Sequence, residues 1–306
     1  IEGLMDFVQG PDFPTGGIIY DKKDILTMYA TGRGGVVLRA KAEIVEAKSG
    51  LFKIVVKEIP YQVNKANLIE KIARLVQEKK IIGIKDLRDE SNKDGVRIVI
   101  ELKKSAYPKK VLNKLYKMTD LQTTFHMNMI ALVDGIQPRL MTLKSVLEEY
   151  VKHRQIVVRR RTAFDLRKAE ERAHILEGLS KALDKIDQVI SVIRASKDKE
   201  EAKQNLMKKF KFTERQVVAI LDMRLQQLAN LERKKIEDEL KEKLALIKEL
   251  QGILASEKKI LGIIKDEVSD VRAKFANPRR TKVVARGIKE FTIEDLVPNE
   301  PTIIMA

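Results

Sequence analysis

The chain has 306 residues and a net charge of +16; hydrophobic residues make up 44%, charged residues 34% and aromatic residues 5%, with no Trp. This composition favours long helices over an all-β fold, and the length favours two or three structural units. The absence of Cys excludes disulfides and thiolate metal sites, and no apolar run approaches the roughly 18 residues that cross a bilayer, so we expect no membrane partner.

The positive charge is concentrated in the first part of the chain. Residues 1–168 contain 32 Lys and Arg against 20 Asp and Glu. A basic bias on the scale of a domain is expected of a protein that binds the phosphate backbone of nucleic acids, because each neutralised phosphate releases condensed counterions. Charge that serves only solubility is the alternative.

Residues 1–141 predict an α+β domain. The chain starts at Ile1 and soon enters a turn-rich connector, residues 11–17, so we expect a piece of a longer protein. Alternating apolar side chains predict a strand over residues 35–45. A turn at residues 48–50 leads from it into a second strand that starts at Phe52, and the two strands are expected to form a hairpin.

After Pro60 the apolar spacing becomes helical, and the elements alternate again. We expect a helix at residues 65–80, followed by strands at 81–87 and 96–102. A second helix is expected to start at the Pro at position 108. A final irregular segment is expected at 125–141. The order of strands and helices is that of an α+β domain.

Two long helices are predicted next, over residues 142–196 and 231–276. Apolar residues at spacings of three and four mark a heptad seam in the first helix, at Leu176, Leu179, Leu183, Ile186, Ile190 and Ile193. The seam of the second helix is Ile236, Leu240, Lys243, Ile247, Leu250, Leu254, Glu257, Leu261, Ile264, Val268, Val271 and Phe275. At 1.5 Å per residue both helices are roughly 70–80 Å long, so they are expected to form an antiparallel coiled coil.

Residues 197–230, between these helices, predict a small helical tip. Its second helix starts after Thr213, which makes a capping box with Gln216. The apolar surface of this helix exceeds what a small tip can bury, which predicts self-association; packing against the preceding helix alone is the alternative. Residues 277–306 are expected to start a new unit, with strand-like segments at 281–284 and 301–305 that lack partners.

Enzyme motifs are missing from the chain, but basic segments are present. The loop Gly32-Arg33-Gly34-Gly35 lacks the glycine spacing of both common nucleotide-binding motifs. No metal-binding pattern and no Ser-His-Asp pattern occurs in the sequence. The loop could approach a phosphate, with Arg39 and Lys41 on the following strand, or be a plain tight turn. The run Arg159-Arg160-Arg161 could follow a phosphate backbone or pair with acidic groups elsewhere in a longer parent chain.

Several segments resemble the A subunits of bacterial type IIA DNA topoisomerases, and DNA gyrase in particular. In chain order they are Gly10-Pro11-Asp12-Phe13-Pro14-Thr15, Thr31-Gly32-Arg33-Gly34, Arg39-Ala40-Lys41-Ala42-Glu43, Glu58-Ile59-Pro60-Tyr61-Gln62-Val63-Asn64-Lys65, Leu87-Arg88-Asp89-Glu90-Ser91, Asp94-Gly95, Arg172-Ala173-His174-Ile175-Leu176-Glu177-Gly178 and Ala219-Ile220-Leu221-Asp222-Met223-Arg224-Leu225. The resemblance extends over nearly the whole chain.

The resemblance implies an architecture of five parts. Residues 1–141 would be the tower domain that flanks bent DNA, 142–196 and 231–276 the coiled coil, 197–230 the exit-gate dimerisation tip, and 277–306 a linker with the start of the C-terminal DNA-wrapping domain. The cationic residues expected at DNA are Arg33, Arg39, Lys41, Lys65, Arg159 and Arg160. The residues expected at the dimer interface are Ile220, Leu221, Met223, Arg224, Leu225 and Leu228.

The chemistry is expected elsewhere in such an enzyme. The family's nucleophilic Tyr lies in a winged-helix domain that this chain lacks, so we expect no catalytic residue, metal site or cofactor here. Magnesium and ATP are expected in the B subunit, and the expected partners are DNA, a second copy of the chain and the B subunit, in the cytoplasm at the nucleoid. The alternatives are the A subunit of topoisomerase IV, a structural coiled-coil protein that binds DNA and a stand-alone basic nucleic-acid module.

Overall fold

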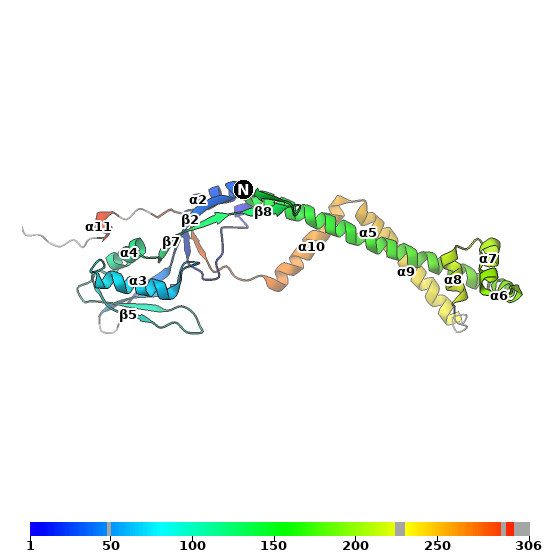
Figure 1. Cartoon of the computed structure of the whole chain (residues 1–306), viewed down its shortest axis with the longest axis horizontal. Coiled ribbons are helices and arrows are strands. Elements are labelled where there is room, and N and C mark those ends of the chain that lie inside the picture. The colour runs from blue at the N-terminus through cyan, green and yellow to red at the C-terminus, as the bar shows by residue number, and fades with distance from the viewer. Residues whose placement is uncertain (48–49, 224–229, 289–291, 297–306) are drawn as a thin grey trace, which may run out of the picture. The chain divides into compact units, whose positions relative to one another are not determined.

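The computed structural model describes residues 1–47, 50–223, 230–288 and 292–296 (Figure 1). The chain divides into two compact units, which we call the sheet unit, Ile1–Glu149 with Asn277–Ala306, and the helical unit, Tyr150–Ala276. Among the described residues, no helix is long and apolar enough to cross a membrane.

The first sheet of the sheet unit has four strands in the order β10-β1-β2-β7. In that order the strands are Lys282–Val284, Ile18–Tyr20, Arg33–Arg39 and Gln122–Asn128. The helices of this part of the chain are α1, Glu2–Met5, and α2, Lys22–Thr31. β1 and β10 run parallel, whereas β2 is antiparallel to both its neighbours. Apolar residues of α2, including Ile25 and Met28, are buried in one cluster with Ile19, Val36 and Leu38 of the sheet.

The second sheet is antiparallel, with the order β3-β4-β6-β5. Its strands are Lys41–Glu46, Phe52–Glu58, Ile98–Leu102 and Ile84–Asp89, and its helices are α3, Lys65–Gln77, and α4, Pro108–Met118. Leu68 and Ile72 of α3 and Leu115 of α4 are buried against strand residues such as Ile54 and Ile100. The predicted helix from residue 65 and the helix start at Pro108 are confirmed.

The strand predicted over residues 35–45 is wrong as a single element. The chain leaves the first sheet at Arg39 and enters the second at Lys41, so only β3 forms the expected hairpin with β4. Ala40, at the crossing, is fully buried, and its N–H donates to the carbonyl of Leu121 at 2.7 Å. Every second side chain faces inward in both strands, and the alternation continues without a break through the crossing. Periodicity therefore cannot detect the change of sheet.

The irregular segment predicted over residues 125–141 is also wrong. β7 extends through Asn128, and β8, Ile130–Val133, pairs with β9, Gln137–Leu140, in a separate two-stranded sheet. Pro138 is tolerated because β9 pairs on one side only, and a Pro can occupy such an edge strand. The expected turn at Asp134-Gly135 connects β8 and β9, with positive φ at both residues.

The helical unit is built from two runs of helix joined by two short helices. The first run consists of α5, Leu143–Asp184, which starts in the sheet unit, and α6, Ile186–Ala195. The two short helices are α7, Lys199–Phe210, and α8, Glu214–Leu221. The return run consists of α9, Asn230–Leu254, and α10, Glu257–Phe275. Ion pairs Arg172–Glu239 and Arg154–Glu267 show that the runs are antiparallel, since a later residue of one pairs with an earlier residue of the other.

Both long helices are interrupted where continuous helix was predicted. The first breaks at Lys185, which has non-helical dihedral angles, and the break lets Val189, rather than the predicted Ile190, become fully buried in the tip. The second breaks at Ser256, whose side chain accepts a hydrogen bond from the N–H of Lys259 and caps α10. Ser favours a cap over a helix interior because its oxygen satisfies an amide that the first turn leaves free.

Residues 277–288, the described residues directly after the second long helix, belong to the sheet unit. The strand expected at residues 281–284 is present as β10, and it has a partner, β1. The loop before it is held by Asp12, whose carboxylate accepts from the N–H groups of Arg280 and Thr281. A short helix, α11, Ile293–Leu296, follows; the segment expected at 301–305 lies outside the described residues.

Candidate nucleic-acid interface

The six cationic residues predicted at DNA are divided between the two units. Arg33, Arg39, Lys41 and Lys65 belong to the sheet unit, and Arg159 and Arg160 to the helical unit. Each of the six is therefore described within its own unit.

Arg33 is exposed at the start of β2 and forms no ion pair in the described part of the chain. It follows Gly32, which caps α2 with a φ of 75°. A side chain at position 32 would place its Cβ 2.1 Å from the carbonyl oxygen of Met141, so the tight turn needs Gly here. The loop is therefore a tight turn that also exposes Arg33, and the phosphate contact stays a prediction.

Arg39 is half-buried in the sheet unit instead of lying on a basic outer face. Its guanidinium carbon lies 5.1 Å from the ring centre of Tyr20 and 4.7 Å from that of Tyr116, and its Nε donates to Gln122. Burial raises the pKa of Tyr116 to about 12, although the nearby Arg39 charge opposes this shift. The predicted phosphate contact conflicts with this placement, because cation–π contacts and a hydrogen bond already engage the guanidinium.

Lys41 is exposed and Lys65 half-exposed, and each pairs with a carboxylate. Lys41 Nζ lies 3.3 Å from Glu58, whose other oxygen accepts from the N–H of Gly17 at 2.6 Å. Lys65 Nζ lies 2.7 Å from Asp89. Hydrogen bonds from Lys65 and Ser91 lower the pKa of Asp89 to about 2. Each cation can approach a phosphate only in competition with its carboxylate.

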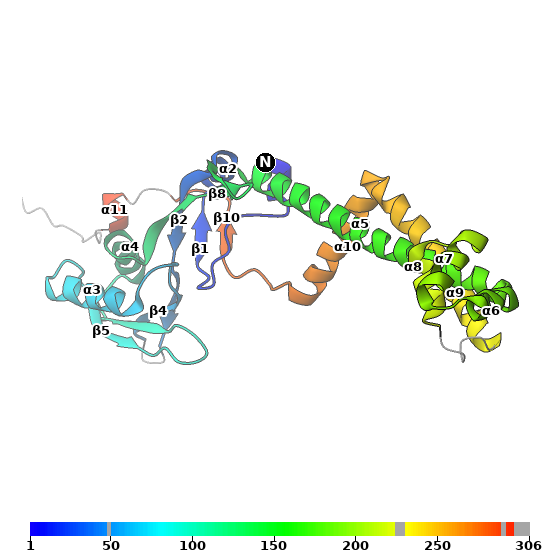
Figure 2. The same ribbon diagram turned by 45° about the vertical axis from the view of Figure 1, so that its right-hand side comes forward.

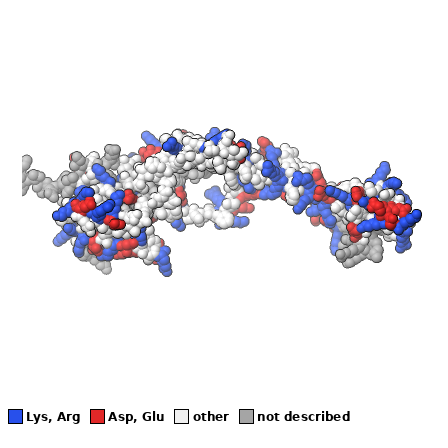
Figure 3. Space-filling view, in the orientation of Figure 1, with Lys and Arg blue, Asp and Glu red and all other residues white. Residues whose placement is uncertain are grey.

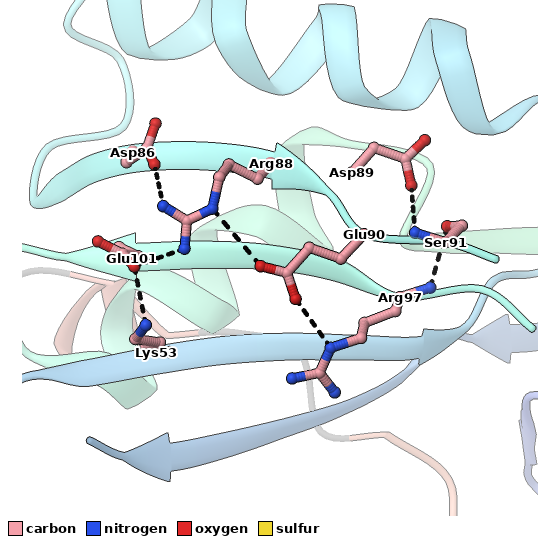
Figure 4. Close-up of polar contacts among 8 residues, drawn as sticks. All are labelled: Lys53, Asp86, Arg88, Asp89, Glu90, Ser91, Arg97 and Glu101. Atoms are coloured by element: carbon pink, nitrogen blue, oxygen red, sulfur yellow. Dashed lines mark hydrogen bonds and ion pairs between the residues drawn. The ribbon is translucent and has the colours of Figure 1, made fainter. Parts of the chain in front are cut away.

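A network of ion pairs lies beside Asp89 on the second sheet (Figure 4). Arg88 binds Asp86 and Glu101, both at 2.7 Å, and Lys53 binds the same Glu101 at 2.8 Å. Arg97 binds Glu90 at 2.9 Å. Hydrogen bonds from Lys53 and Arg88 lower the pKa of Glu101 to about 2. Three cations and three carboxylates therefore balance on this face, which leaves little net charge to attract a polyanion.

The basic run of α5 is largely paired within the chain itself. Arg161 and Arg154 both bind Glu267 of α10, and Arg159 lies 3.2 Å from Glu257. Arg160 is exposed and has no ion pair in the ranges the structure describes. Acidic and basic side chains are interspersed along these helices (Figure 3). The acidic partners that were expected in a longer parent chain are thus on the returning helix, and Arg160 is the available cation.

The predicted self-association surface is partly the tip's own core. Ile220 is buried with Val217, Leu206 and Phe210, while Leu221 and Met223 are half-buried at the edge of this cluster. Packing against the preceding helices therefore accounts for Ile220. Val218 on the same helix is 41% exposed. Arg224, Leu225 and Leu228 lie outside the described residues.

The capping box predicted in the tip is confirmed: Thr213 and Gln216 exchange side-chain and backbone hydrogen bonds at the start of α8. The side-chain amide of Gln216 also donates to the carbonyl oxygen of His174, at 2.8 Å, and so joins α8 to α5. In the described ranges, no group of three or more His, Asp or Glu side chains is arranged to hold a metal ion.

One basic segment was missed in the sequence. Between Leu102 and Thr119 the chain has six Lys and no Asp or Glu, which is a signal that local charge counting could have detected. The six are Lys103, Lys104, Lys109, Lys110, Lys114 and Lys117. They occupy the loop after β6 and helix α4.

Comparison with known proteins gives consistent matches along the chain. The model of the DNA gyrase/topoisomerase IV family of A subunits matches residues 2–269. The DNA gyrase A subunit of Clostridium acetobutylicum is 54% identical over 301 residues, which are 98% of this chain and 36% of that protein. For the homologous protein of Staphylococcus epidermidis, identity is 51% over 305 residues, 99% of this chain and 34% of that protein. The one from Halalkalibacterium halodurans is 54% identical over 301 residues, again 98% and 36%. The chain thus spans about a third of the length of these relatives.

Proposed function

The chain belongs to the family of DNA gyrase/topoisomerase IV A subunits, and on this premise we propose that it is part of the A subunit of a bacterial DNA gyrase. Gyrase changes DNA topology by passing one duplex through a double-strand break in another, driven by ATP, and introduces negative supercoils. The observation that carries the proposal is the identity of 51–54% to DNA gyrase A subunits over nearly the whole chain.

We assign the sheet unit to the DNA-flanking tower. The exposed Arg33 and the net positive charge of residues 1–141, with 24 Lys and Arg against 17 Asp and Glu, support this role, because phosphate contacts need available cations. Among the six predicted cations, Arg33 and Arg160 are the best candidates for DNA contact. The ion pairs of Lys41, Lys65 and Arg159 make them weaker candidates, and the half-buried position of Arg39 between two rings favours a structural role.

We assign the helical unit to the antiparallel coiled coil and the exit gate, which would dimerise with a second copy of the chain. The antiparallel runs and their cross-helix ion pairs support the coiled coil. The half-buried Leu221 and Met223, with the exposed Val218, support a contact surface at the tip. In the proposed complex the partners are DNA, this second copy and the gyrase B subunit, in the cytoplasm at the nucleoid.

The nucleophilic Tyr of the cleavage reaction is proposed to lie in the part of the gyrase protein that this chain does not cover, and the magnesium and ATP sites in the B subunit. Burial raises the pKa of Tyr29 and Tyr116, which opposes formation of a phenolate nucleophile. Tyr61 stacks on Phe13, and Tyr20 packs against Arg39. Because the nucleophile is proposed to lie outside this chain, the purified chain is expected to form no covalent adduct with DNA. A DNA-linked species after denaturing electrophoresis would contradict this expectation.

A chimaeric protein tests the proposed function. Residues 2–269 would replace the homologous segment in the DNA gyrase A subunit of Staphylococcus epidermidis, and the chimaera would be assembled with the matching B subunit. We expect ATP-dependent supercoiling above that of a matched chimaera carrying Leu221→Asp, which would weaken the gate. An assembled, folded chimaera that binds DNA but passes no strand would contradict the proposal.

The A subunit of topoisomerase IV is the second candidate, because the description of the matching family model includes both enzymes. The gyrase names of the relatives favour gyrase. A purely structural coiled-coil protein, or a stand-alone DNA-binding module, has no comparable support from the relatives.

A further inference from the structure

The end of the sheet unit that carries α4 concentrates positive charge. Lys103, Lys104 and Lys109 are exposed, whereas Lys110 and Lys114 are half-buried along the helix. We call these five residues the lysine surface. No acidic residue occurs between Leu102 and Thr119, so the local sequence offers no neutralising charge.

The lysine surface differs from the other charged face of this unit. Lys53, Arg88 and Arg97 are each paired with a carboxylate (Figure 4). By contrast, Lys103, Lys104, Lys109 and Lys114 form no ion pair among the described residues. Unpaired lysines close together repel one another, and an anion bound between them relieves that repulsion. The lysine surface is therefore the part of the unit best suited to a polyanion.

A cavity of about 270 Å³ opens within this surface. Lys103, Lys110 and Lys114 contribute to its walls, together with Ser105 and Tyr107, which is 54% exposed. Lys groups act on phosphate as point charges, and Ser and Tyr hydroxyls are common donors to phosphate oxygens. The cavity thus combines charge, hydrogen-bond donors and an accessible aromatic ring.

An acidic segment of the same chain lies at the edge of this cavity. Leu296, the last residue of α11, lines it, and Asn113 of α4 donates to the carbonyl oxygen of Asp295 at 3.2 Å. Glu294 and Asp295 give α11 two negative charges in its single turn. Both views show α11 beside α4 (Figures 1 and 2). The charge of α11 is complementary to the lysine surface, and so it would compete with another anion.

We propose that the lysine surface binds the phosphate backbone of duplex DNA and that α11 is an acidic cover that competes with DNA for it. This inference rests on the proposed function, since it names a second contact region for the same DNA. Lysines on a loop and along one helix match a run of phosphates better than a single small anion. Without side chains that read base edges, the contact is independent of sequence.

The first test measures how binding of a fluorescent DNA duplex to the whole 306-residue chain depends on salt. The variant Lys103→Gln/Lys114→Gln removes two unpaired cations. The slope of log affinity against log salt concentration is expected to flatten by about 2, because each lost phosphate contact removes about 0.9. Lys197→Gln/Lys208→Gln, which removes two exposed lysines of the helical unit, is the matched control and should leave the slope nearly unchanged. Equal flattening in both variants would overturn the proposal in favour of bulk charge.

The second test concerns the acidic cover. The substitution Glu294→Gln/Asp295→Asn removes both charges. It also weakens the hydrogen bond that the Asp295 carboxylate accepts from the N–H of Thr292. DNA affinity should rise several-fold in the wild-type background and much less in the Lys103→Gln/Lys114→Gln background. An equal rise in both backgrounds would show only a change of net charge and would overturn the competition. This comparison of the acidic substitutions in two backgrounds is a double-mutant cycle, and it measures the coupling without an assumption about the strength of either contact.

The outcomes separate this inference from the proposed function. If the wild-type chain shows no salt-dependent DNA binding, the tower assignment fails and the inference fails with it. If DNA binds and only the Arg33→Ala variant weakens it, the tower assignment stands and the lysine surface is not a DNA contact. If inorganic phosphate at low concentration displaces DNA from the wild-type chain but not from the lysine variant, the cavity binds small anions, which contradicts a run of contacts along a duplex.

Discussion

Arg33 and Arg39 begin and end the same strand, yet they have opposite surroundings. Arg33 extends into solvent, while Arg39 lies between the rings of Tyr20 and Tyr116. The difference follows from the position of Arg39 at the crossing between the two sheets, where Tyr116 donates from its hydroxyl to the carbonyl of Ala40. Residue type and spacing alone therefore do not distinguish a cation for DNA from a cation for the core.

Two substitutions should separate these roles. Arg39→Ala is expected to lower the free energy of unfolding of the sheet unit by about 2 kcal/mol, from two cation–π contacts and one hydrogen bond. Arg33→Ala should change stability by less than about 0.5 kcal/mol and flatten the salt slope of DNA binding by about 1. Urea unfolding can be followed by tyrosine fluorescence, since all tyrosines except Tyr150 lie in the sheet unit. A stable Arg39→Ala variant with weakened DNA binding would contradict the structural role.

The carboxylates of Asp89 and Glu101 should make the sheet unit sensitive to acid. Both have a pKa of about 2 in the folded chain, below their ordinary values of 3.8 and 4.5. A lowered folded-state pKa means that the stabilisation is present above the ordinary pKa and is lost as the pH falls toward 2. The variant Asp89→Asn/Glu101→Gln should therefore lose less stability than the wild type between pH 4.5 and 2. Urea unfolding over this range, with Glu70→Gln as control, measures the difference; parallel curves for both proteins would contradict it.

At the scale of elements, a short interruption decides which side of a helix is buried. The predicted seam of the second long helix continued through residue 257 to Leu261. After the cap at Ser256, however, α10 buries Ile260 and Ile264 against Val158, and Leu261 is 43% exposed. After the interruption Ile260 takes the buried place predicted for Leu261, while Ile264 is buried as predicted, so the spacing before Ile264 is four residues instead of three.

Ile260 is expected to stabilise the helical unit and Leu261 is not. Ile260→Ala should cost about 2–4 kcal/mol, because it removes a fully buried side chain and leaves a cavity next to Val158. Leu261→Ala, one residue away, should cost less than about 1 kcal/mol. Urea unfolding followed by circular dichroism at a helical wavelength compares the two. Equal losses, or a larger loss for Leu261→Ala, would restore the original seam.

At the scale of the whole molecule, the main functional question is self-association through the tip. Val218 is exposed and Leu221 half-buried at the edge of a core that already includes Ile220. If this edge forms the gate, Val218→Asp and Leu221→Asp should each weaken the dimer by roughly tenfold or more. Lys208→Asp on the neighbouring helix α7 is a charge-changing control that should not. Light scattering over a dilution series measures the dimer; a wild-type chain that stays monomeric throughout would contradict the gate.

The sequence by itself determined the local elements whose signals are contained in a few turns of chain. The helix from Lys65, the helix opened by Pro108 and the Thr213 capping box are all confirmed, because cap chemistry and apolar periodicity act between residues close in sequence. The family was also recognisable from short segments in a fixed order, and the matches over residues 2–269 confirm it.

Only the tertiary structure decided which partners those elements take. β10 pairs with β1, and Asp12 binds the backbone of Arg280, a contact between residues 268 positions apart. The same holds for charge: Glu267 of the returning helix pairs with both Arg154 and Arg161, while the lysine surface meets no carboxylate in its own segment. A strand edge or a cation is satisfied by whatever group folding brings within a few ångströms, and local spacing contains no information about that group.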